Sequence, residues 1–164
     1  MNSKLGIAGI AIAAVLVAAA VGLRWQRGLE AGLPPRIEAA SKAEAVQRAF
    51  AFATDSGGVI IEVLGTGSMA PYIPAAPTGA DPLNTVVAIV VTQPRATFAD
   101  IAAGSLVTYR AEWSPRFSVM HQAARRDSNG WIMTGLANAE YEARWRVTEN
   151  NFLGIVSRTF VWPQ

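Results

Sequence analysis

A run of 19 residues near the amino terminus, Leu5–Leu23, carries no charge and contains only Gly, Ala, Ile, Val and Leu. A helix rises about 1.5 Å per residue, so this run would be about 28 Å long, close to the thickness of the hydrocarbon core of a bilayer. The run therefore predicts a transmembrane helix. With its flanking residues it gives an N-terminal membrane anchor over residues 1–27.

Basic and aromatic residues border this run without deciding its orientation. Lys4 precedes it, and Arg24, Trp25 and Arg27 follow it, as side chains at a membrane interface commonly do. A cleaved signal peptide is the alternative, because residues 18–20 are alanines that could lie near a cleavage site. The apolar run is longer than that of a typical signal peptide, so we favour the anchor.

Residues 28–57 are expected to connect the anchor to a folded domain. Glycines and prolines between positions 28 and 35 favour an irregular connector over a continuing helix. Residues 36–52 are rich in Ala, Glu, Lys and Gln, and apolar side chains recur every three or four positions. These are Ile37, Ala40, Ala43, Val46 and Phe50. The spacing predicts a short amphipathic helix that packs against the core or a membrane surface.

From position 58 onward, short β-branched runs alternate with Gly, Pro, Asn and Asp. The runs are Val59–Leu64, Val86–Thr92, Leu106–Arg110, Phe117–His121, Trp131–Thr134 and Phe152–Phe160. Short runs of this kind, bounded by turn residues, are typical of strands in a mainly β, antiparallel fold. We therefore predict one β-rich domain over residues 58–164, with a long loop or insertion at about 74–100.

Composition narrows the chemistry that this domain can perform. The formal net charge is only +2 and the basic residues are scattered among acidic ones, which argues against nucleic-acid binding. The chain has no cysteine and one histidine, His121, so it can form neither a disulfide framework nor a conventional zinc site. We expect no cofactor, and any reaction must use hydroxyl, imidazole or carboxylate groups.

The segment Gly65–Ala70 follows a predicted strand and fits the letters of a dinucleotide-binding fingerprint, G-x-G-x-x-A. That fingerprint requires a helix to start at its end, so that the helix N-terminus binds the pyrophosphate. Pro71 and Pro74 oppose such a helix. The remaining readings are an ordinary turn serine at Ser68 and a reactive serine exposed on a tight glycine-rich turn.

Five segments that follow the order of a known family's motifs favour the reactive serine over the ordinary turn serine. Thr66-Gly67-Ser68-Met69-Ala70-Pro71 resembles the nucleophile box of type I signal peptidases, Ser-Gly-Ser-Met-x-Pro. Further segments are similar to later boxes of this serine peptidase family, especially its archaeal and endoplasmic-reticulum branch. They are residues 104–109, Val119-Met120-His121, residues 134–138 and the pair of stretches at 147–148 and 153–156. The likeness covers about residues 58–157 and implies the complex antiparallel β fold of that family.

The resemblance implies a role for each matched residue. Ser68 would be the nucleophile, and His121 would be its base, as in the Ser-His branch. Both lysines of the chain, Lys4 and Lys42, precede Ser68, which argues against the Ser-Lys arrangement of the bacterial enzymes. The oxyanion hole would combine the Ser68 amide with the Thr66 hydroxyl.

Two departures from the family pattern, the missing aspartate and the insertion at about 74–100, leave open the possibility that catalysis is lost. Leu136 stands where the branch has an aspartate, and the later family aspartate aligns with Glu142 or, less well, Glu140. Glu142 is therefore the candidate orienting carboxylate. The apolar run predicts a single-pass membrane protein, and the resemblance implies that its domain is extracytoplasmic and cleaves precursor proteins with small residues near the cut. The alternative is a catalytically inactive β domain that serves as a binding or assembly module.

Overall fold

Strands dominate the structure, a computed structural model that describes residues 32–112, 114–138 and 146–164. Residues Leu33–Gln164 form one compact unit, which is mainly antiparallel β-sheet, as the sequence predicts. The expected anchor, Leu5–Leu23, lies outside the described residues. Among those that are described, no helix is both long enough and apolar enough to cross a membrane.

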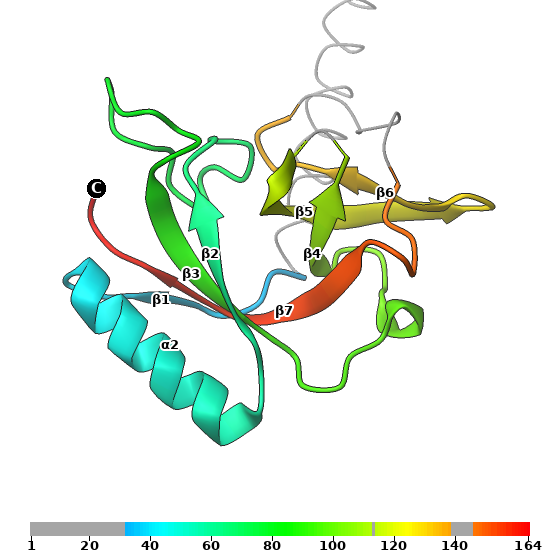
Figure 1. The fold of residues 1–164 in the computed structure, drawn as a ribbon, viewed down its shortest axis with the longest axis horizontal. Helices are drawn as coiled ribbons and strands as arrows, with labels where there is room; N and C mark the ends of the chain where they lie inside the picture. The colour runs from blue at the N-terminus through cyan, green and yellow to red at the C-terminus, as the bar shows by residue number, and fades with distance from the viewer. Residues whose placement is uncertain (1–31, 113, 139–145) are drawn as a thin grey trace, which may run out of the picture. The chain divides into compact units, whose positions relative to one another are not determined.

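The elements follow one another along the chain as shown in Figure 1. They are β1 (Arg36–Glu38), α2 (Lys42–Ser56), β2 (Ile60–Leu64), β3 (Val86–Thr92), the short 3₁₀ helix η1 (Phe98–Asp100), β4 (Leu106–Ala111), β5 (Ser114–Asp127), β6 (Gly130–Thr134) and β7 (Phe152–Val161). Each β-branched run that was predicted to be a strand is one. β5 is much longer than predicted, and β1 was not predicted.

The long strand β7 joins the two halves of the sheet, whose order is β2-β3-β7-β4-β5-β6. Its first half pairs with β4, through Val107 opposite Ile155, and its second half pairs with β3, through Ile89 opposite Phe160. β1 adds to the second half in parallel. Figure 1 shows β2 and β3 at one end of β7, and β4, β5 and β6 at the other. A side chain at the middle of the sheet can therefore contact both halves.

The predicted helix is present, but its start and its buried face differ from the prediction. Residues 36–38 form β1, and the helix α2 begins only at Lys42. Ser41 caps it by accepting a hydrogen bond from the Glu44 amide at 3.2 Å, the kind of signal that marks a helix start. Gly57, with φ of 75°, ends it in a left-handed conformation that favours glycine.

Alanines, not the larger apolar residues, face the sheet from α2. Ala45, Ala49 and Ala53 are buried, whereas Val46 is 40% exposed and Phe50 is 65% exposed. The predicted apolar face was therefore wrong. Side chains as small as Ala let the helix approach β3 and β7 closely, because they fill little of the space between helix and sheet.

Candidate active site

Ser68 lies in the long connection between β2 and β3, residues 65–85, which we call the Ser68 loop. The loop contains turns and no helix, so the fold lacks the helix that a dinucleotide fingerprint requires. Three of its side chains, Met69, Tyr72 and Ile73, are buried. The Tyr72 hydroxyl forms hydrogen bonds of 2.8 Å with the Pro34 carbonyl and the Thr159 hydroxyl. The loop is thus anchored to the core directly after Ser68.

Two glycines shape the turn that presents Ser68. Gly67 has a φ of 82°, a left-handed conformation that glycine adopts without steric cost. At Gly65 a β-carbon would lie 2.5 Å from the Ala76 amide nitrogen, so no side chain fits there. The Gly65 carbonyl accepts a hydrogen bond from that same amide at 2.9 Å, which closes the loop upon itself.

His121 lies near the middle of β5, where it is only 4% exposed. Its neighbours alternate between the two faces of the strand, as side chains on a strand do. Val119 and Ala123 belong to one buried cluster, whereas Met120 belongs to another. Packing on both sides of the strand fixes the backbone that carries the imidazole.

The central contact of the site joins these two segments. His121 Nε2 lies 3.0 Å from Ser68 Oγ, within hydrogen-bond distance, although the residues are 53 positions apart. Thr66 Oγ1 lies 3.2 Å from the same Ser68 oxygen. On the other side of the ring, His121 Nδ1 lies 3.1 Å from the Tyr109 hydroxyl. The four side chains form one continuous chain of hydrogen bonds.

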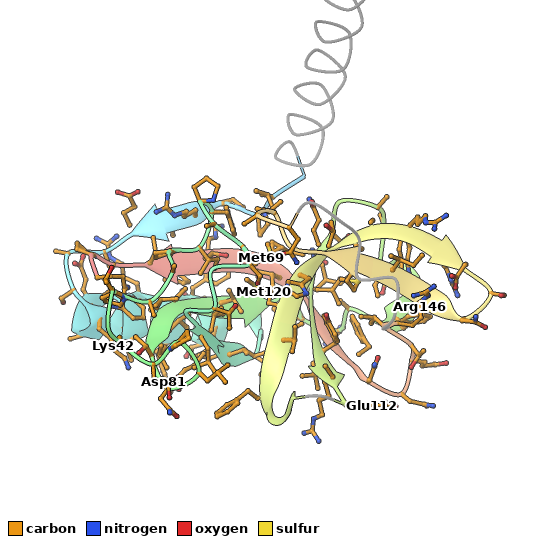
Figure 2. All side chains as sticks on the ribbon, turned by 90° about the horizontal axis from the view of Figure 1, so that it is seen from above. Lys42, Met69, Asp81, Glu112, Met120 and Arg146 are labelled. Carbon is orange, nitrogen blue, oxygen red and sulfur yellow. The ribbon has the colours of Figure 1, made fainter. Side chains whose placement is uncertain are left out.

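The residues next to Ser68 and His121 help to hold this contact in place. Met69 and Met120 are buried in the same apolar cluster, and Figure 2 shows them near each other at the centre of the molecule. Met69 directly follows Ser68 and Met120 directly precedes His121, so membership of one buried cluster helps to hold the two segments together. Lys42 is labelled at one end of the molecule in Figure 2, well apart from Met69.

A second segment, the turn at residues 135–138, contacts the backbone of Ser68. The Ala137 amide donates a hydrogen bond to the Ser68 carbonyl at 3.0 Å. At Gly135 a β-carbon would lie 2.5 Å from that same carbonyl oxygen, so any larger residue would push the serine away. Within the described part of the chain, the Ser68 amide itself makes no hydrogen bond and can donate to a substrate oxygen.

No protein-family model matches the chain, and no curated protein or solved structure is significantly similar to it. A serine hydroxyl bonded to an imidazole is the arrangement that nucleophilic catalysis requires, because the imidazole can remove the serine proton during attack.

The other predicted site residues fall into two groups. Thr66 is exposed, and its hydroxyl lies beside Ser68 Oγ. Leu136 packs against the apolar cluster that contains Met69 and Met120. Glu142, the predicted orienting carboxylate, lies outside the described residues, as does Glu140. In the described ranges, no group of three His, Asp or Glu side chains is arranged to hold a metal ion.

Tyr109 is a contact that the sequence analysis missed. It ends the segment 104–109 that resembles a family box, and the sequence assigns it no role in the site. In the structure it is 1% exposed and lies within hydrogen-bond distance of the second ring nitrogen of His121. Tyr109 and His121 are diagonal neighbours across the β4–β5 pair, since Val107 is opposite His121 and Tyr109 is opposite Val119. The register of this pair was the missing information.

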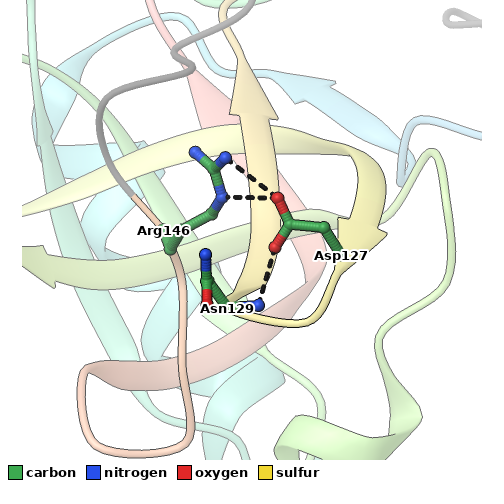
Figure 3. Close-up of polar contacts among 3 residues, drawn as sticks. All are labelled: Asp127, Asn129 and Arg146. Atoms are coloured by element: carbon green, nitrogen blue, oxygen red, sulfur yellow. Dashed lines mark hydrogen bonds and ion pairs between the residues drawn. The ribbon is translucent and has the colours of Figure 1, made fainter.

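An ion pair joins Arg146 to Asp127, the last residue of β5. The Arg146 guanidinium donates to Asp127 Oδ2 from Nε at 3.1 Å and from Nη2 at 2.9 Å (Figure 3). The backbone amide of Asn129 donates to the other carboxylate oxygen, Asp127 Oδ1, at 2.8 Å. Val147 then pairs with Trp131 of β6 through two backbone hydrogen bonds. The hairpin of β5 and β6 therefore holds the chain at Arg146 and Val147.

Acid is expected to weaken this anchor. The hydrogen bond from Arg146, followed by that from the Asn129 amide, holds the pKa of Asp127 below its ordinary value of 3.8. A lowered folded-state pKa contributes stability above the unfolded-state pKa, and this contribution is lost as the pH falls through the folded-state pKa. In thermal unfolding at a series of pH values, Asp127→Asn should therefore melt below the native chain at pH 7. The difference should vanish below the folded-state pKa, and a difference that persists there would contradict this reasoning.

Proposed function

We propose that this chain is a membrane-anchored serine endopeptidase, similar to signal peptidase I, that cleaves precursor proteins near the membrane surface. The observation that carries the proposal is the 3.0 Å contact between Ser68 Oγ and His121 Nε2. This contact joins a serine on a tight, glycine-shaped turn to the single histidine of the chain. The same two residues are those that the motif order pairs.

The proposed reaction proceeds through an acyl-enzyme. Ser68 Oγ attacks the scissile carbonyl carbon while its proton passes to His121 Nε2, and the carbonyl oxygen becomes an oxyanion. The Ser68 amide and the Thr66 hydroxyl donate to that oxyanion. The carbon–nitrogen bond then breaks as His121 returns the proton to the leaving amine. Water, deprotonated by His121, then attacks the ester carbonyl carbon. The bond from that carbon to Ser68 Oγ breaks, His121 returns the proton to Ser68 Oγ, and the carboxylic acid product leaves.

The membrane anchor has a physical purpose in this proposal. A tether confines the enzyme and a membrane-bound precursor to one surface, which raises their effective concentration without any new contact. The resemblance to signal peptidases implies small apolar side chains near the cut, as in Ala-x-Ala, and a domain on the extracytoplasmic side. The partners are then a precursor protein and membrane lipid, with no role for nucleic acid.

A second candidate function is a catalytically inactive β domain that binds or assembles other proteins. Leu136 favours it, because an apolar side chain packed into a core cluster occupies the position where the similar branch has an aspartate. In this alternative the Ser68–His121 contact is a structural hydrogen bond, and the domain catalyses no reaction.

Cleavage of synthetic precursors separates the two candidates. The full-length chain in detergent would be incubated with peptides that carry small residues before a defined bond, and products would be identified by mass spectrometry. The peptidase proposal expects cleavage after a small residue, and a heat-denatured sample should give none. Binding of the peptides without any product across the panel would instead support the inactive module.

A further inference from the structure

The proton chemistry of His121 depends on which ring nitrogen is unprotonated. Nε2 faces Ser68 and must accept its proton, so in the neutral ring the hydrogen has to reside on Nδ1. Which tautomer exists is set by the hydrogen bond that the other nitrogen makes. A hydrogen-bond partner of Nδ1 therefore influences whether Nε2 acts toward the Ser68 hydroxyl as an acceptor or as a donor.

Tyr109 is placed to be that partner. Its hydroxyl oxygen lies 3.1 Å from His121 Nδ1, and the centres of the two rings are 6.2 Å apart. Both side chains are nearly fully buried, at 1% and 4% exposure. Tyr109 comes from β4 and His121 from β5, and the paired backbones of these strands fix the separation of the two rings.

We propose that Tyr109 is a positioning residue. Its hydroxyl oxygen accepts a hydrogen bond from the Nδ1–H of His121, and this keeps Nε2 unprotonated and able to accept the Ser68 proton. The role in turnover rests on the proposed peptidase function, whereas the tautomer is a property of the protein without substrate. The contact also serves the step after attack. The imidazolium donates from both nitrogens, and the phenol oxygen can still accept from Nδ1.

A phenol acts differently from the carboxylate that usually holds such a histidine. A neutral phenol orients the ring through a hydrogen bond and itself places no negative charge beside it. The proposed site therefore has an orienting group in Tyr109 even though Leu136 is apolar.

The single histidine allows a direct test. In the full-length chain, labelled with ¹⁵N-histidine and studied in detergent, both ring nitrogen signals belong to His121. At a pH where the ring is neutral, the native chain should carry the proton on Nδ1. Tyr109→Phe removes only the hydroxyl, and its ring signals should shift toward those of the Nε2–H tautomer. Its kcat should fall about three- to tenfold, the effect of one lost hydrogen bond, with KM unchanged.

Tyr72→Phe is the matched control. Like Tyr109→Phe, it removes a buried tyrosine hydroxyl. The Tyr72 hydroxyl forms its two hydrogen bonds with Pro34 and Thr159, not with His121. It should lower the unfolding midpoint and leave the His121 proton on Nδ1, because the Tyr109 hydroxyl beside that nitrogen is kept. A native ring protonated on Nε2, or unchanged ring signals in Tyr109→Phe, would overturn the inference. A native chain that cleaves nothing would refute the peptidase proposal, and the ring signals would still decide the role of Tyr109.

Discussion

Ser68→Ala and His121→Ala should each reduce precursor cleavage by roughly 10⁴- to 10⁶-fold, because residues that act as a unit lose nearly all their effect when either is removed. Without the hydroxyl no acyl-enzyme can form, and without the imidazole the 3.0 Å acceptor of the serine proton is gone. The measurement is kcat/KM with a precursor peptide that the native chain cleaves. The double variant Ser68→Ala/His121→Ala should be no slower than either single variant.

Controls distinguish a chemical role from a general loss of structure. Ser157→Ala removes a serine whose hydroxyl donates to the Val91 carbonyl at 2.9 Å, and it should leave kcat/KM near the native value. The unfolding midpoints of the variants should be compared by the same thermal scan. If the effects of Ser68→Ala and His121→Ala multiplied in the double variant, the two side chains would not share one proton transfer.

Sequence patterns located the strands better than they located what packs on them. A strand with β-branched residues between turn signals is recognisable alone, because both its propensity and its burial appear in a short window. β1 has only three residues and exists through pairing with β7, where Arg36 is opposite Thr159. No local pattern encodes a partner more than a hundred positions away.

The helix shows a different kind of missing information. In α2, the series Ala45, Ala49, Ala53 has the same helical spacing as the pair Val46 and Phe50, so periodicity gives two adjacent stripes. Hydrophobicity favours the stripe with the larger side chains. The structure buries the alanines instead, because the distance between helix and sheet decides which stripe fits.

For the candidate site, the sequence supplied the residue types and their order, but not their third partner. Ser68 and His121 were paired by motif order, and their 3.0 Å contact agrees with that pairing. The contact of His121 with Tyr109 depends on the β4–β5 register, which a shift at Arg110 and Ala111 makes irregular near the turn. Without the register, Tyr109 is indistinguishable from an ordinary buried strand aromatic.

Thr66→Ala should lower kcat about 10²- to 10³-fold with little change in KM, because an oxyanion donor acts mainly in the transition state. Thr66 Oγ1 lies 3.2 Å from Ser68 Oγ and belongs to an exposed residue, so the hydroxyl can turn toward a substrate carbonyl. Single-turnover rates with a cleavable precursor peptide would measure the chemical step apart from binding and product release.

Thr66→Ser provides the matched variant, since it keeps the hydroxyl and removes only a methyl group. If the hydroxyl donates to the oxyanion, Thr66→Ser should retain most of the native rate while Thr66→Ala does not. If Thr66 only shapes the turn, both variants should cleave at the native rate, because the left-handed conformation of the turn is adopted by Gly67. A loss in Thr66→Ser as large as that in Thr66→Ala would instead assign the effect to the methyl group and remove Thr66 from the oxyanion hole.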